Sequence, residues 1–174
     1  MKNKKGVSPL IATVLLIAFA VALGAVVMNW GRGYVEDTAN TARERSDTEV
    51  KCASDVDIAV VDIDGTPQIC YNISGTTDYM EMIVENRKST TVESLTVRMI
   101  GTSTRVPETY NLGDSSNLTA NKAKFFNVSY DAGTLGDIQQ VKITPTIKVA
   151  GQDVICAQNA EIVNNLKPCS EIYT

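Results

Sequence analysis

The feature that most constrains this chain is a run without a charged side chain at positions 7–30. The run reads VSPLIATVLLIAFAVALGAVVMNW, and it is longer than the roughly 20 residues that cross a bilayer core. A single segment in hydrocarbon must satisfy its own backbone hydrogen bonds, so we expect a helix. Lys2, Lys4 and Lys5 precede the run and Arg32 follows it. The positive-inside bias therefore places the N-terminus in the cytoplasm and the rest of the chain outside.

The residues alone also allow two other interpretations of this segment, a cleaved secretory signal and an uncut membrane anchor. Ala20-Val21-Ala22 has the small-residue pattern of a signal-peptidase site, and cleavage there would release a soluble domain starting at Leu23. The apolar run continues to Trp30, however, whereas a secretory signal has an apolar region of only about 7 to 15 residues. An uncut segment would be a simple anchor for a monomeric surface domain.

The start of the run carries a leader-like pattern. Its residues are Lys4, Lys5 and Gly6, followed directly by Val7, Ser8, Pro9, Leu10 and Ile11. This pattern resembles the class III signal of type IV pilins and archaellins, specifically that of the archaeal pilins. The resemblance covers residues 1–35, and it implies that a membrane prepilin peptidase cuts the Gly6–Val7 bond.

The physical chemistry of this start agrees with such processing. Lysines keep the cut at the aqueous surface, and Gly6 has no side chain to hinder the approach of a protease. Ser8 is a suitable helix cap, and Pro9 fits the first helical turn. Bacterial type IV pilins usually carry a glutamate where this chain would have Ile11. The resemblance is therefore to the archaeal branch and does not extend to a glutamate-dependent docking step.

Small residues on the expected helix allow close packing. Ala18 and Ala22, and separately Ala20 and Gly24, stand four positions apart, so each pair lies on one helix face. The residues expected to pack against other helices are Leu10, Ile11, Val14, Ala18, Ala20, Ala22 and Gly24.

We expect residues 7–51 to form the apolar helix and a polar extension of it. In residues 32–51, charges of both signs alternate with small residues and leave a weak apolar stripe at helical spacing. Gly31 and Gly33 predict a bend. A solvated linker is the alternative for residues 32–51.

Beyond Cys52 the apolar period changes to two residues, which predicts strands. The expected strands are 56–60, 68–73, 80–85, 92–100, 109–112, 124–130, 141–149 and 154–162. Asp64-Gly65-Thr66-Pro67 predicts a turn that joins the first two as a hairpin. Pro145 indicates that the strand containing it is an edge strand or a bulged one.

Short strands at near-regular spacing, without a helix between them, indicate an antiparallel β-sandwich of immunoglobulin-like type. A β-sandwich head is also what the resemblance to archaeal pilins and archaellins implies. With its N-terminal helix the chain is predicted to be α+β. The predicted parts are a leader at 1–6, the helix and its extension at 7–51, and an extracellular β-sandwich domain at 52–174.

Composition and motifs argue against an enzyme. The chain has no histidine, the commonest general base and metal ligand, and it has neither a G-x-S-x-G motif nor a phosphate-binding glycine loop. Its formal charge of −4 would become −7 without the three leader lysines, and no basic patch predicts nucleic-acid binding. We expect no catalytic residues, no cofactor and no metal.

Four cysteines, Cys52, Cys70, Cys156 and Cys169, follow the apolar run. An oxidising compartment outside the membrane would favour disulfides between them, and three pairings are possible. We favour Cys52 with Cys70 and Cys156 with Cys169. Neither pair has the spacing of a zinc knuckle.

Asn72, Asn117 and Asn127 each begin an N-x-S/T sequon. Strand alternation turns Asn72 and Asn127 outward, and Asn117 lies in a polar loop. All three are therefore candidate acceptors of an N-glycan.

A group of acidic residues could be read as a calcium site. The group comprises Asp55, Asp57, Asp62 and Asp64. Strand alternation places the first two on a solvent face, and turn chemistry explains Asp64-Gly65. No run of alternate ligands ending in a glutamate is present, so we do not expect calcium binding.

These observations predict a structural subunit, a major or minor pilin, of an archaeal type IV pilus-like filament. Before assembly its helix lies in membrane lipid. In the filament the helix packs with those of identical or related subunits in a helical homopolymer, and the β-domains lie outside. The resemblance implies a prepilin peptidase, an assembly ATPase and a membrane platform protein as partners. An archaellin is the nearest alternative, although the V-S-P start favours a pilin. A monomeric, membrane-anchored binding domain is the alternative from another class.

Overall fold

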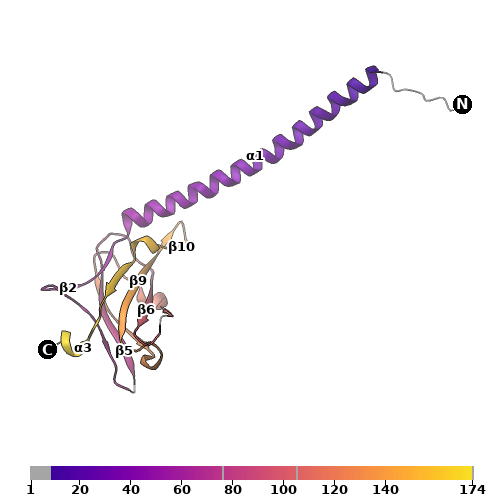
Figure 1. The fold of residues 1–174 in the computed structure, drawn as a ribbon. Coiled ribbons are helices and arrows are strands. Elements are labelled where there is room, and N and C mark those ends of the chain that lie inside the picture. Colours follow the sequence, from indigo (N-terminus) through magenta and orange to yellow (C-terminus); the bar gives the residue numbers. More distant parts are fainter. Residues whose placement is uncertain (1–8, 76, 105, 174) are drawn as a thin grey trace. The chain divides into compact units, whose positions relative to one another are not determined.

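The structure is a computed structural model that describes residues 9–75, 77–104 and 106–173. It divides into two compact units, Met1–Ser46 and Asp47–Thr174. The described part of the first unit is most of one long helix, and the second unit holds the last turns of that helix and a mostly antiparallel set of strands (Figure 1). We call the second unit the β-rich domain.

Helix α1 (Pro9–Asp55) contains the whole described part of the uncharged run and the polar segment after it. The polar segment is therefore helical, and it is not the linker that we considered as an alternative. The helix continues unbroken through Gly31 and Gly33, where we predicted a bend. Its C-terminal turn buries Cys52, so this end of α1 is part of the core of the β-rich domain.

The first sheet is centred on β5 (Asp78–Asn86). One edge of β5 pairs with β8 (Ala123–Tyr130), and the other edge pairs first with β4 (Ile69–Asn72) and then with β1 (Ile58–Val60). A short parallel pair joins β12 (Lys167–Pro168) to β4. Burial alternates along β5, as the two-residue period of a strand with one buried face requires.

The two segments that flank the Asp64-Gly65 turn do not form the predicted hairpin. Both segments contain strands, but β1 and β4 each pair with β5 and not with each other. Between them β2 (Asp62–Ile63) and β3 (Thr66–Pro67) form a small ribbon of their own. Asp64 and Gly65 turn this ribbon with φ angles of 52° and 81°, as expected for a two-residue hairpin turn. The turn was predicted correctly because it depends on Asp64 and Gly65 alone. The pairing of the longer strands was not, because it depends on how β1 and β4 are buried beside β5.

The second sheet is centred on β9 (Ile138–Val149). One edge of β9 pairs with β6 (Ser94–Gly101), and the other edge pairs with β10 (Gln152–Ile155) and β11 (Glu161–Asn164). The far edge of β6 pairs with β7 (Glu108–Asn111). The strand that contains Pro145 is therefore central and not an edge strand. The other alternative, a bulged strand, agrees with the shift in register between β9 and β6 at Ile100 and Gly101.

Pro145 is tolerated because it lies beside a break in the neighbouring edge. Its carbonyl oxygen accepts a hydrogen bond from the Cys156 amide at 2.9 Å, where pairing passes from β10 through η2 (Ala157–Asn159) to β11. The missing N–H of proline thus falls where no ladder partner needs it. The same break divides the predicted strand 154–162 into two.

The two sheets share one buried core. Its largest fully buried side chains include Met80, Met82, Leu95, Met99, Leu118, Leu135, Ile138, Ile143 and Ile147. Three short helices, η1 (Gly113–Ser116), α2 (Ala132–Leu135) and α3 (Cys169–Ile172), were not predicted. Helix α2 packs so closely on β6 that a Cβ at Gly101 would lie 2.0 Å from the Leu135 carbonyl oxygen. This contact requires glycine.

Candidate functional site

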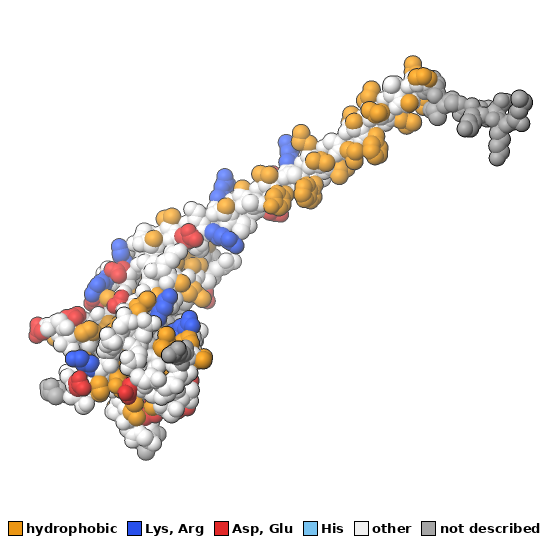
Figure 2. Space-filling model, in the orientation of Figure 1, with side chains coloured by type: hydrophobic (Ala, Val, Ile, Leu, Met, Phe, Trp, Pro, Cys, Tyr) orange, Lys and Arg blue, Asp and Glu red, His pale blue; other side chains and the backbone are white. Residues whose placement is uncertain are grey.

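The candidate site for insertion or assembly is the apolar stretch of α1, where large side chains stand uncovered (Figure 2). Their exposed fractions run from 50% at Leu23 to 73% at Trp30. The most apolar 18-residue window has a mean hydropathy of 2.9, and none of it is buried. In the described part of the chain, α1 is the one helix long and apolar enough to cross a membrane. A contiguous apolar surface of this size indicates that lipid or another chain covers it.

Every residue predicted to pack against another helix is uncovered in the single chain. These residues are Leu10, Ile11, Val14, Ala18, Ala20, Ala22 and Gly24. A Cβ placed on Gly24 would meet nothing within 4 Å.

Gly24 and Gly31 form a feature that the sequence analysis missed. Gly31, which we interpreted as a bend, lies inside the helix seven residues after Gly24, so the two glycines share nearly one face. They lie along a shallow, open hollow on α1 whose other lining residues are apolar at one end and charged at the other: Val27, Met28, Val35, Arg32 and Glu36. Glycine on a helix face lets a neighbouring backbone approach closely. The spacing of the two glycines was the signal that could have revealed the hollow.

An aromatic pair marks the end of the apolar stretch. The rings of Trp30 and Tyr34 stack with centroids 5.9 Å apart and planes inclined by 17°, one helical turn from each other. Trp and Tyr are enriched at the level of lipid headgroups, and Arg32 stands between these two in the sequence. The helix thus changes from apolar to charged at an aromatic boundary of the kind that a membrane interface holds.

The predicted processing residues lie outside the described residues. They are Lys4, Lys5, Gly6 and Val7, and the predicted cap Ser8 lies there as well. Pro9 is the first residue of α1 that the structure describes. The cut between Gly6 and Val7 thus stays a prediction from the sequence.

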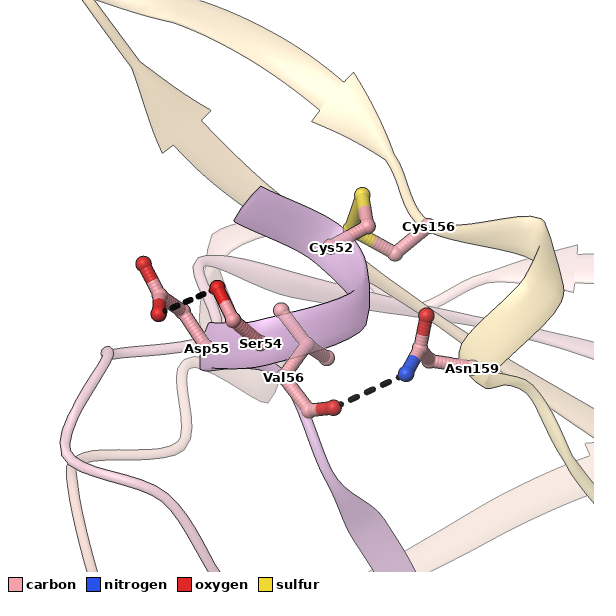
Figure 3. The surroundings of a disulfide bond; sticks show 6 residues. All are labelled: Cys52, Ser54, Asp55, Val56, Cys156 and Asn159. Carbon is pink, nitrogen blue, oxygen red and sulfur yellow. Dashed lines mark hydrogen bonds between the residues drawn. A yellow bond between two sulfur atoms is a disulfide. The ribbon is translucent and has the colours of Figure 1, made fainter. Parts of the chain in front are cut away.

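The last turn of α1 is fastened to the β-rich domain in three ways (Figure 3). A disulfide joins Cys52 to Cys156, with their Cα atoms 5.4 Å apart. The side-chain amide of Asn159 donates to the Val56 carbonyl oxygen at 2.9 Å. Val56 itself is 2% exposed and belongs to the core. The helix end is therefore held by a covalent bond, a hydrogen bond and apolar burial together.

The four cysteines form two disulfides, but not in the pairing that we favoured. The bonds are Cys52–Cys156 and Cys70–Cys169, with sequence separations of 104 and 99 residues. The favoured pairing joined cysteines near in sequence. It was wrong because η2 follows β10 directly and brings Cys156 to the end of α1, while β12 runs beside β4 and places Cys169 next to Cys70.

Glu81 lies close enough to both sulfur atoms of the second disulfide to resemble a three-ligand metal cluster. Both sulfurs are engaged in Cys70–Cys169, however, and offer no thiolate to a metal. Of the acidic group considered for calcium, Asp62 accepts the Gly65 amide at 2.7 Å, which is turn chemistry. Asp64 belongs to the same turn.

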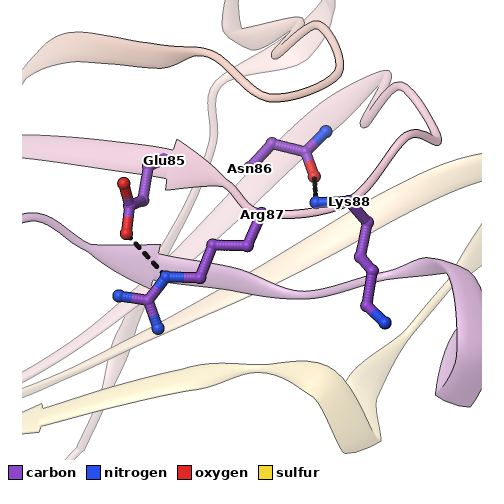
Figure 4. A network of polar contacts seen from close by, with 4 residues as sticks. All are labelled: Glu85, Asn86, Arg87 and Lys88. Atoms are coloured by element: carbon purple, nitrogen blue, oxygen red, sulfur yellow. Dashed lines mark hydrogen bonds and ion pairs between the residues drawn. The ribbon is translucent and has the colours of Figure 1, made fainter.

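A polar network holds the turn after β5 (Figure 4). The Arg87 Nε donates to Glu85 Oε1 at 2.6 Å, and this hydrogen bond raises the pKa of the Arg87 guanidinium. Asn86 is 2% exposed, accepts the Lys88 amide at 3.1 Å and donates to the Thr90 carbonyl oxygen at 2.7 Å. These bonds order the turn through buried amide contacts.

The three sequons differ in how free their acceptor nitrogens are. Asn72 is half-buried on β4, and its Nδ2 donates to the Tyr79 hydroxyl at 2.7 Å. Asn117 is half-buried at the end of η1. Asn127 is exposed on β8, and its Nδ2 donates to Glu81 Oε1 at 3.3 Å in an exposed hydrogen bond. The sequence pattern alone could not rank them.

In a host that N-glycosylates its surface proteins, we expect a glycan on Asn127 and none on Asn72. The Asn72 nitrogen would have to give up a short, partly buried hydrogen bond before transfer, whereas the hydrogen bond of Asn127 is longer and exposed to solvent. Intact mass spectrometry should show that Asn127→Gln removes one glycan mass and that Asn72→Gln removes none. A glycopeptide carrying sugar on Asn72 would contradict this ranking.

No protein-family model matches the chain, and no curated protein sequence matches it.

Proposed function

We propose that this protein is a structural subunit, a major or minor pilin, of an archaeal type IV pilus-like surface filament. It polymerises through the apolar part of α1 after a prepilin peptidase has cut the Gly6–Val7 bond. Before assembly the helix lies in membrane lipid with its N-terminus in the cytoplasm. The mature protein is extracellular, with its β-rich domain on the outside of the fibre.

The observation that carries this proposal is the uncovered apolar surface from Leu10 to Trp30. Lipid and a bundle of identical helices both keep such a surface away from water. Transfer from lipid to the bundle gains close van der Waals packing and no further dehydration. Ala18, Ala22 and the hollow at Gly24 and Gly31 supply the small-residue faces that such packing uses.

The β-rich domain supports an exported location. Two disulfides are typical of proteins that leave the reducing cytosol. We also propose that this domain is a sandwich of immunoglobulin-like type, because two mostly antiparallel sheets contribute to one core. The resemblance at residues 1–35 supports an assembly ATPase and a membrane platform protein as partners, with possible N-glycans on the outer surface.

The test is the mass of the N-terminus in surface fibres sheared from cells. A polypeptide that starts at Val7 and forms the repeating unit of the fibre supports the proposal. A start at Leu23 would identify a soluble secreted domain, and an intact Met1 on single molecules in the membrane would identify a plain anchor. Fibres that lack this polypeptide would overturn the proposal.

A further inference from the structure

The outer face of the second sheet carries two cations that lie directly opposite each other. Arg98 on β6 pairs in register with Lys142 on β9, across the two central strands of the sheet. Residues directly opposite have Cβ atoms about 5 Å apart. The neighbours of both residues along the strands, such as Val97 and Val141, are fully buried, so strand alternation turns Arg98 and Lys142 outward.

Neither cation has an acidic partner. Arg98 and Lys142 form no hydrogen bond or ion pair with any residue that the structure describes. No Asp or Glu occupies this face of β6, β7, β9 or β11. Lys148, at the end of β9, differs from them because it does have an acidic partner. Its Nζ lies 3.8 Å from Oδ1 of Asp153, which is directly opposite on β10.

Like charges directly opposite each other destabilise a sheet. The chain as a whole is acidic, with a formal charge of −4, so this positive centre is a local arrangement. An anion bound over the sheet would neutralise both side chains at once, and the Arg98 guanidinium can hold a carboxylate with two hydrogen bonds.

The groups around the pair narrow the class of anion. Thr96 and Thr144 face each other in one neighbouring row, Gln140 lies in the other, and Thr109 stands beside Arg98 on β7. Hydroxyl and amide groups of this kind match the hydroxyl groups of a sugar. An apolar centre, which stable protein interfaces need, is missing. The apolar residues on this face are Ile100, Ile162 opposite Lys142, and Ile155 opposite Thr146, and each stands apart from the others. No aromatic residue occupies this face of β6, β7, β9 or β11, whereas single-stranded nucleic acids are held by aromatic stacking.

We propose that this face binds a carboxylate-bearing polysaccharide, with Arg98 and Lys142 on its carboxylate groups and the threonine and glutamine side chains on its hydroxyl groups. The site uses only residues of the β-rich domain.

The test uses the full chain in a non-ionic detergent, with alginate oligosaccharides as the probe and neutral dextran oligosaccharides of equal length as the comparison. We expect alginate to bind in titration calorimetry, dextran to bind weakly or not at all, and affinity to fall at high salt. The R98Q/K142Q variant should bind alginate about tenfold more weakly or worse, since two charge-assisted contacts are lost. The K88Q/K122Q variant removes the same charge from exposed lysines elsewhere and should bind like the parent.

The melting temperature separates a binding role from a structural one. Removal of a like-charge pair should leave the Tm of R98Q/K142Q equal to or above that of the parent. Equal binding of alginate and dextran, unchanged affinity of R98Q/K142Q, or a clear fall in its Tm would each overturn the proposal. Binding of polyglutamate or single-stranded DNA as tightly as alginate, through the same two residues, would overturn the assignment to a polysaccharide.

Discussion

Replacing Gly6 with leucine should abolish both the trimming of the N-terminus and the appearance of filaments. Glycine has no side chain, so a protease in the membrane surface can approach the backbone closely before the cut. A branched side chain at this position blocks that approach. Intact mass spectrometry should then find only the chain that begins at Met1, and electron microscopy should find no fibres that contain it.

The matched control for this variant is Gly33→Leu. It adds the same side chain to α1 at a position where a new Cβ would meet nothing within 4 Å, and it leaves the leader unchanged. Its N-terminus should be trimmed as in the parent. Normal fibres built from the Gly6→Leu chain would count directly against the proposed processing step, and with it against the proposed function.

Removing either disulfide should cost the β-rich domain a large part of its stability. The two bonds close loops of similar length, with separations of 104 and 99 residues. The chain-entropy treatment assigns about 4.7 kcal/mol to a loop of roughly 100 residues, within a usual range of about 2 to 5 kcal/mol. The C52A/C156A and C70A/C169A variants should therefore both melt roughly 10 °C or more below the parent.

The two variants should show increased hydrogen exchange in different parts of the β-rich domain. Loss of Cys52–Cys156 leaves the end of α1 held by Val56 and the Asn159 hydrogen bond, so hydrogen exchange should rise in residues 47–56. Loss of Cys70–Cys169 should instead raise exchange in β12 and α3, which that bond holds beside β4. Both cysteines are replaced in each variant so that no free thiol remains to form a wrong pair. Peptide mapping that finds Cys52 bonded to Cys70 would contradict the structure on which this prediction rests.

Local signals in the sequence were read correctly where the physics is local. The uncharged run ending at Trp30 must form a helix in lipid, and its described part, from Pro9 onward, is helical. The two-residue alternation from Met80 to Val84 lies on a strand with one buried face. Asp64 and Gly65 adopt the positive φ angles that their turn requires. Each of these outcomes depends on residues only a few positions apart.

Predictions that depended on residues far apart in the sequence were wrong or incomplete. The turn at Asp64 was right, but its flanking strands pair with β5 and not with each other. Pro145 indicated an edge strand or a bulged one. The strand is central, because a break between β10 and β11 leaves room for the proline, and its register with β6 is shifted at Gly101. The packing face was found only in part, because we interpreted Gly31 as a bend and not as one side of the hollow with Gly24.

The sequence by itself determined that this chain contains an apolar helix suited to lipid, followed by strands with one apolar face, and carries four cysteines where disulfides can form. Only the tertiary structure decided that Cys52 bonds to Cys156 and Cys70 to Cys169, that Asn72 is engaged with Tyr79, and that Arg98 faces Lys142. The physical reason is the separation in sequence between the residues that interact. Helix and strand periods follow from neighbouring residues, whereas contacts across about a hundred residues depend on how all the apolar faces are buried together.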